Sequence, residues 1–321
     1  MKEKFIRIAT WLGIMLALTI VALLLWKILF HADQSTSSLK WLQFLQTAGT
    51  FLLPPVLCAL IWDPNRRPLA WLKMDRTVPW WYYLAGILIM IAALPAINLL
   101  ADLNGRVQLP ESLDSIEQFL KQQEEAAAAL TERFLQADNF GVLLINIALM
   151  ALLPAISEEL SFRGTLQQIL GNKHIAIWVT AIIFSAIHMQ FYGFIPRMLI
   201  GALLGYMFVW TGSLWIPVLM HFTNNGLAVL AFYLFDERAV DNKNIADSVG
   251  AGDTWWLGLI SLVITCLGLL IFYRRTHKQE SSCEYGYPSA AVQESSRDNR
   301  HRSRARSLLQ PDRYVHSYEY V

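Results

Sequence analysis

The stretch Ser157-Glu158-Glu159-Leu160-Ser161-Phe162-Arg163-Gly164 places two carboxylates and a guanidinium at the end of a long apolar run. An ionisable side chain inside a membrane helix costs about 3 kcal/mol on insertion scales, so it indicates a functional site that contains a partner. Helical residues four apart share a face, so Glu159 and Arg163 can pair, whereas Glu158 points about 100° away from Glu159. The spacing therefore predicts one paired glutamate and one glutamate that is free for chemistry.

The composition is that of a membrane protein. Of the 321 residues, 55% are hydrophobic and 16% are charged, and the mean hydropathy is +0.37, which is more apolar than an average soluble domain. The net charge of +1 gives no overall field that would attract nucleic acid, and we expect no nucleic-acid partner. Cys58, Cys266 and Cys283 are far apart, so they predict neither a disulfide framework nor a CxxC metal site.

Apolar runs that are long enough to cross a bilayer recur along the chain, since a spanning helix needs about 20 residues. The first run follows Lys2, Lys4 and Arg7 but is too long for a signal peptide, so we expect a retained membrane helix. The sequence thus predicts an all-α, polytopic membrane helix bundle of about eight transmembrane helices. The predicted spans lie near residues 5–30, 41–62, 80–101, 139–157, 175–192, 196–211, 214–235 and 255–273.

Three parts are expected along the chain. Residues 1–137 would form the N-terminal membrane helices and an extramembrane amphipathic segment, and residues 138–274 the membrane-helix core with the charged stretch. Residues 275–321, rich in Ser, Glu, Arg and Tyr, would form a disordered polar tail. The arginines of the tail could bind anionic lipid or nucleic acid, but a solvated tail is the simpler interpretation.

Lysine and arginine in the short loops predict the orientation. Basic residues gather at the N-terminus and in the loop 63–79, whereas Asp and Glu dominate the loops 102–138 and 236–254. Cytoplasmic loops carry the excess of Lys and Arg, so we expect both termini in the cytoplasm. No organelle-targeting signal is evident, and a bacterial inner membrane is the expected location. Residues 112–135 predict one or two amphipathic helices, either a lid over the bundle or a solvated linker.

Two further pairs of residues place polar groups on apolar runs. Phe184 and His188 are four apart on the fifth predicted span, and His221 and Asn225 are four apart on the seventh, so the members of each pair share a face. On two antiparallel helices joined by a short turn, Glu158 and His188 would lie at one depth. The spacing permits convergence of these groups but does not require it.

A carboxylate, two imidazoles and an amide in a mostly dry site suit peptide hydrolysis. We expect Glu158 to take a proton from water while His188 orients or polarises that water. His221 and Asn225 would supply donors where an oxyanion develops on the attacked carbonyl. The predicted ion pair of Glu159 would hold the helix and stabilise the site.

The three motifs together resemble a known family. Glu-Glu-x-x-x-Arg at 158–163, Phe-x-x-x-His at 184–188 and His-x-x-x-Asn at 221–225 occur in this order on successive hydrophobic runs. This arrangement is similar to that of the CPBP family, also called the CAAX protease and bacteriocin-processing or Abi family, whose eukaryotic relatives include the Ras-converting CAAX endopeptidase. The similarity covers roughly residues 139–235.

The resemblance implies an intramembrane glutamic endopeptidase with an eight-helix core and no metal or other cofactor. It implies that Glu158 is the base, that His188 is the partner of the water, and that His221 and Asn225 are the oxyanion donors. The substrate would be a peptide or a protein C-terminus, with or without a lipid modification, that enters from the bilayer or the cytoplasm.

Two other interpretations remain open at this point. Glu158, His188 and His221 could form a His₂Glu zinc site, although the sequence has no HExxH. Alternatively, the chain could be a non-catalytic immunity, scaffold or transport protein that binds a peptide without cutting it, since many bacterial members of the family are linked to bacteriocin self-immunity.

Overall fold

The computed structural model describes residues 2–171, 174–235 and 249–284. Residues 278–284 are described by their backbone alone. Every regular element in these ranges is a helix. The chain divides into two compact units, Met1–Tyr273 and Arg274–Val321. The first unit contains all the predicted site residues. The residues after 284 and most of the predicted acidic loop 236–254 lie outside the described residues.

Seven helical segments in these ranges are long and apolar enough to cross a membrane. This finding confirms a multi-pass helical bundle. The segments are α1 (Lys2–Phe30), α2 to α3 (Thr36–Trp62), α5 (Trp80–Gly105), α7 to α9 (Phe140–Leu170), α11 (Phe194–Thr211), α12 (Trp215–Leu234) and Gly252–His277. Their parts include α2 (Thr36–Thr47), α3 (Leu53–Trp62), α7 (Phe140–Asn146), α8 (Leu153–Ser161) and α9 (Gln168–Leu170), and the last segment contains most of α14 (Trp255–Glu284).

The fifth predicted span is shorter than expected. Helix α10, His174–Ala186, has 13 residues, which at 1.5 Å per residue is about 20 Å, against a hydrocarbon core of about 30 Å. The chain leaves the helix just after it, at Met189, whose φ of 53° is left-handed. The predicted run of residues 175–192 therefore divides into a short helix and a loop that leads to α11.

Two of the long segments widen into a π-helical turn before a proline. The turn η1 (Ala48–Leu52) precedes Pro54, and η3 (Ile147–Leu152) precedes Pro154. Proline donates no hydrogen bond and its ring crowds the carbonyl four residues back, so a wider turn accommodates it without breaking the helix. A third π-helical turn, η4 (Phe162–Gln167), lies directly after the two glutamates.

Close packing of α11 on α10 depends on two glycines that are four residues apart. A Cβ atom added at Gly205 would lie 2.8 Å from Ile177 Cγ2, and one added at Gly201 would lie 3.2 Å from Ala181 Cβ. Small residues at this spacing let membrane helices approach closely. The backbone of α11 thus comes close to α10.

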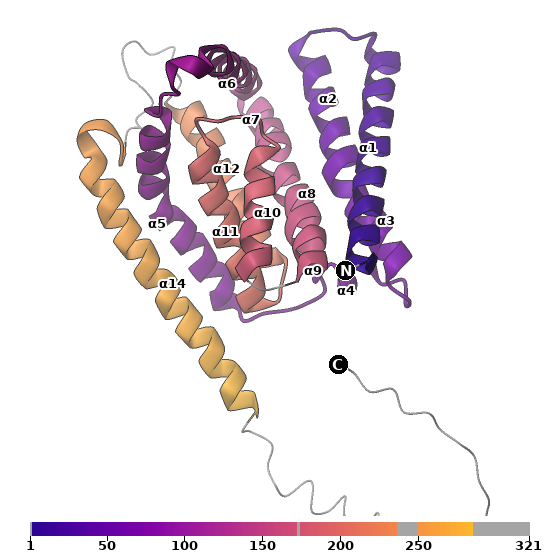
Figure 1. Cartoon of the computed structure of the whole chain (residues 1–321), viewed down its shortest axis with the longest axis vertical. Helices are drawn as coiled ribbons and strands as arrows, with labels where there is room; N and C mark the ends of the chain where they lie inside the picture. The colour runs from indigo at the N-terminus through magenta and orange to yellow at the C-terminus, as the bar shows by residue number, and fades with distance from the viewer. Residues whose placement is uncertain (1, 172–173, 236–248, 285–321) are drawn as a thin grey trace, which may run out of the picture. The chain divides into compact units, whose positions relative to one another are not determined.

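Helix α6 (Asp114–Leu135) lies across one end of the neighbouring helices (Figure 1). It is one amphipathic helix, as the sequence allowed, and it is tied to the bundle at two places. Arg133 Nη2 donates to Gln34 O at 2.6 Å, and Glu124 Oε2 accepts a hydrogen bond from Tyr192 N at 3.3 Å. These contacts favour the lid over the free linker. The short α4 (Pro68–Trp71) and η2 (Glu111–Leu113) complete the connections to α5 and α6.

Candidate functional site

Glu159 is the paired glutamate, as the helical spacing predicts. Its carboxylate is completely buried, and Arg163 Nη1 donates to its Oε1 at 2.7 Å. Arg163 is also completely buried; its Nη2 donates to Gly201 O at 2.7 Å, and its guanidinium lies 4.9 Å from the centre of the Phe184 ring. The ion pair is thus held on several sides and has no access to solvent.

The turn η4 docks on the two close-packed glycines of α11. Arg163 donates to Gly201 O, and one helical turn further on Gln167 Nε2 donates to Gly205 O at 3.2 Å. Both side chains are fully buried. Because helix carbonyls are accessible only where no side chain covers them, the glycines allow two side-chain contacts that fix α8 and η4 against α11.

His221 connects the two glutamates. Its Nδ1 is 2.8 Å from Glu159 Oε1, and its Nε2 is 3.9 Å from Glu158 Oε2. Because Glu159 Oε1 is also the acceptor for Arg163, Nδ1–H of His221 is the donor in this bond and Nε2 is the atom that faces Glu158. The sequence placed His221 in the site but gave no signal of its bond to Glu159, which joins residues 62 apart in sequence.

Glu158 is the free glutamate. Its side chain is 14% exposed, against 0% for Glu159. Within the described ranges no hydrogen bond to its carboxylate is found, and His221 is the one cation-forming group within 4.0 Å of it. The predicted division between a paired and an unpaired glutamate is therefore present in the structure.

His188 and Phe184 bring the second motif to the same place. His188 lies just beyond the end of α10, and its Nδ1 donates to Phe184 O at 2.8 Å. The centre of the buried Phe184 ring is 5.1 Å from that of His188 and 6.1 Å from that of His221. Phe184 thus packs against both histidines, a role that the sequence analysis did not assign.

Asn225 is less clearly connected. It is half-buried on α12, one turn beyond His221, and its Oδ1 accepts a hydrogen bond from Asn224 Nδ2 at 3.0 Å. In the part of the chain with described contacts, no hydrogen bond joins it to Glu158 or His188. Its oxyanion role stays a prediction.

The zinc alternative needs a cluster of metal ligands. In the described segments no group of three or more His, Cys, Asp and Glu side chains is arranged to hold a metal ion. His188 and His221 each direct Nδ1 to a protein acceptor, which leaves Nε2 as the atom of each ring that is open to a ligand. The zinc interpretation thus lacks the cluster of three ligands in the described residues, although each histidine has a free ring nitrogen.

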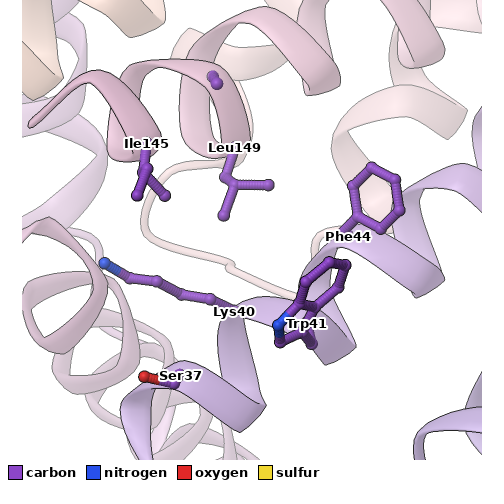
Figure 2. A pocket seen from close by; sticks show the side chains of 7 residues that line it. Ser37, Lys40, Trp41, Phe44, Ile145 and Leu149 are labelled. Atoms are coloured by element: carbon purple, nitrogen blue, oxygen red, sulfur yellow. The ribbon is translucent and has the colours of Figure 1, made fainter. Parts of the chain in front are cut away.

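A separate apolar pocket of about 460 Å³ opens between α2 and the α7–η3 segment. In Figure 2, Lys40 and Trp41 of one helix lie opposite Ile145 and Leu149 of the other. Lys40 Nζ donates to Asn146 Oδ1 at 2.6 Å. None of the predicted site residues lines this pocket, so it is distinct from the glutamate–histidine cluster.

The fold and the cluster define a polytopic α-helical membrane protein with a buried glutamate–histidine centre. Residues 140–227 match the family model Rce1-like, described as "Type II CAAX prenyl endopeptidase Rce1-like". All three motifs lie within these bounds. The match confirms the resemblance to the CAAX protease family for the segment that contains the site.

A curated relative, the "Uncharacterized protein YpbD" of Bacillus subtilis (strain 168), is 40% identical over 81 residues. The aligned region is 24% of this chain and 40% of the relative. The chain therefore spans about two fifths of the length of the curated relative that it matches. No solved structure matches the chain.

Proposed function

We propose that this chain is an intramembrane endopeptidase of the glutamic type, which cleaves a peptide or a protein C-terminus with water and without a metal. The observation that supports this most strongly is the contrast between two adjacent glutamates. Glu159 is buried and its Oε1 is bound by both Arg163 and His221, whereas Glu158 is partly exposed and, among the described residues, has His221 as the one cation-forming group within 4.0 Å. The family match over the same segment supports a CAAX-protease-like activity.

The distance between Glu158 and His221 suits a bridging water. Oε2 and Nε2 are 3.9 Å apart, too far for a direct hydrogen bond, but a water about 2.8 Å from each would connect them. Since Nδ1 of His221 donates to Glu159, a neutral ring has its lone pair on Nε2. His221 can then accept one hydrogen bond from this water while Glu158 accepts the other. In this proposal His221 is a partner of the water, in place of the oxyanion donor that the resemblance implies, because its single N–H is already bound to Glu159.

The reaction follows from these positions. Glu158 removes a proton from the water as the water oxygen bonds to the scissile carbonyl carbon. The amide nitrogen then takes the proton from Glu158 as the C–N bond breaks, which leaves a carboxylate product and an amine. His188 would orient the water through its Nε2, and the Asn225 amide would donate to the oxyanion.

We further propose that the protein lies in a bacterial inner membrane with both termini in the cytoplasm. The basic loop 63–79 and the acidic loop 102–138 support this orientation. The substrate would reach the site from the bilayer or the cytoplasm, and a lipid modification on it is compatible with the apolar surroundings.

The test is cleavage of quenched-fluorescence peptides by detergent-purified protein, with and without a farnesylated cysteine near the peptide C-terminus. Glu158→Gln should lower kcat by about 10³-fold or more, because it removes the general base while it keeps the shape of the side chain. Glu132→Gln, on the exposed face of α6, is the matched control and should keep full activity. Chelator should have no effect, and chelator-sensitive cleavage would restore the zinc interpretation.

A second candidate function is supported by the buried ion pair. Glu159 and Arg163 could hold together a bundle that binds a peptide without cutting it, as in an immunity protein. In that case folded wild-type protein would cleave no peptide, and Glu158→Gln would keep the immunity phenotype. Cleavage that is lost in this variant would exclude the binding function as the main one.

A further inference from the structure

Arg197, in the first turn of α11, is a half-buried cation without an ion pair. Its Nη2 donates to Gln190 Oε1 at 2.7 Å and its Nη1 to Gln190 O at 3.5 Å, and both acceptors are neutral. No carboxylate of the described chain lies within 4.0 Å of its guanidinium. A guanidinium in such a place retains donors for an anion, and carboxylates match its planar geometry best.

The cation belongs to the same electrostatic environment as the proposed site. Arg197 bonds to Gln190, which follows His188 by two residues, and its charge interacts with Glu158, His188 and Glu124. An anionic group that entered next to Glu158 would be repelled by that carboxylate. The positive charge of Arg197 offsets this repulsion.

The loop before α11 holds the guanidinium in place. A Cβ atom added at Gly193 would lie 2.9 Å from Arg197 Nη2, which means that the guanidinium folds back directly over the glycine. The loop itself is fixed by Asn104 of α5, whose Nδ2 donates to Phe191 O at 3.0 Å and whose Oδ1 accepts from Ile195 N at 3.1 Å. The cation is thus oriented before any ligand binds, which lowers the entropy cost of binding.

We propose that Arg197 binds the C-terminal carboxylate of the substrate and so selects peptides whose scissile bond lies close to a free chain end. This inference rests on the proposed endopeptidase function, because it places the substrate at Glu158. It assigns to Arg197 a role in specificity, separate from the water chemistry of Glu158 and His221. A cation that only stabilised the oxyanion would act on every substrate alike, so the two roles give different results.

The test uses two fluorogenic peptides that are identical except for a C-terminal carboxylate or a C-terminal carboxamide. We expect wild type to prefer the acid over the amide by about 10- to 100-fold in kcat/KM, the range of a charge-assisted contact in a partly buried site. Arg197→Gln should bring this ratio to about 1. Arg133→Gln, which removes an arginine of α6 that bonds to Gln34 O, should keep the wild-type ratio.

Gly193→Ala gives a second variant that keeps the charge. The backbone at Gly193, with φ −104° and ψ 6°, accepts alanine, but the new Cβ must displace the guanidinium. The acid-to-amide ratio should therefore fall partway. Equal cleavage of acid and amide by wild type, or an unchanged ratio in Arg197→Gln, would overturn the proposal.

Binding to Glu158→Gln separates this proposal from the proposed function. The same two peptides, titrated into the Glu158→Gln protein, should bind with the acid-over-amide preference, and the Glu158→Gln/Arg197→Gln double variant should lose it. If no peptide is cleaved by wild type but this binding preference is present, the endopeptidase function fails and the carboxylate site stands. If the peptides are cleaved but the binding preference is absent, the carboxylate site fails alone.

Discussion

Two ion pairs in this protein have the same local geometry and opposite surroundings. On α6, Lys121 lies 2.7 Å from Glu117, and on α8–η4, Arg163 lies 2.7 Å from Glu159; both pairs are four residues apart. The side chains of Lys121 and Glu117 are 54% and 13% exposed, whereas both members of the second pair are 0% exposed. Spacing and distance are therefore the same, and burial decides what each pair can do.

The buried pair is better understood as a positioning device than as a source of stability. Glu159 Oε2 and Arg163 Nε have no hydrogen-bond partner in the part of the chain that is described, and a buried ion pair is weak evidence for stability even when it is satisfied. What the pair does accomplish is to hold His221 by its Nδ1. The exposed pair on α6 orients no third group of the site.

The contrast between the two pairs predicts the largest loss of stability for a substitution of Arg163. Arg163→Met should lower the free energy of unfolding by about 3–5 kcal/mol, because it leaves the Glu159 carboxylate buried without its cation. Thermal unfolding in detergent would measure this loss. The matched substitution on α6, Lys121→Met, should lower the melting temperature much less. Similar losses for both variants would mean that burial does not distinguish the pairs.

The next largest loss of stability is expected for substitution of Glu159, and substitution of the adjacent Glu158 should lower activity instead. Glu159→Gln should cost about 3 kcal/mol, the lower end of the same range, because Arg163 is left buried without its anion while the amide oxygen of the new side chain can still accept hydrogen bonds. Glu158→Gln should leave stability close to wild type while activity is lost. Equal losses of stability in the two single variants would contradict the division between a paired and a free glutamate. The measurement is the melting temperature of both variants beside their kcat.

Local spacing explains what the sequence could predict. The i,i+4 rule places Arg163 beside Glu159 wherever the chain is helical, so this ion pair follows from the sequence alone. Long apolar runs likewise predicted the positions of the seven spanning segments. Both inferences depend only on residues that are neighbours in one helix.

Helical spacing and the length of apolar runs do not predict contacts between helices. The bond of His221 to Glu159 depends on how α12 lies against α8, and the early end of α10 at Ala186 depends on a loop that Asn104 of α5 fixes. The position of Arg197 over Gly193 likewise arises from the loop conformation. None of these contacts has a signal in the spacing of one segment.

A smaller effect tests the packing that holds the buried pair. Gly205→Ala should cost about 1–2 kcal/mol, because its Cβ would lie 2.8 Å from both Gln167 Oε1 and Ile177 Cγ2 in the contact of η4 and α10 with α11. Gly13→Ala on α1, where a Cβ meets nothing within 4 Å, should be neutral or slightly stabilising, since alanine favours a helix. Equal melting temperatures for these two variants would show that α11 can move away without cost.

The smallest effect is expected at the exposed pair, where it should depend on pH and salt. The hydrogen bond from Lys121 lowers the pKa of Glu117, so the contribution of this pair is present above the ordinary glutamate pKa of about 4.3 and is lost as the pH falls through the lowered folded value. Any difference in melting temperature between wild type and Glu117→Gln should therefore vanish in acid, and also in about 1 M salt, where the Debye length is about 3 Å. A difference that persisted under both conditions would mean that Glu117 acts through its bond with Leu109 N or through packing. Glu117 would then stabilise the local chain conformation, as the buried pair does. Sensitivity to salt and pH would no longer distinguish the pair on α6 from the buried pair.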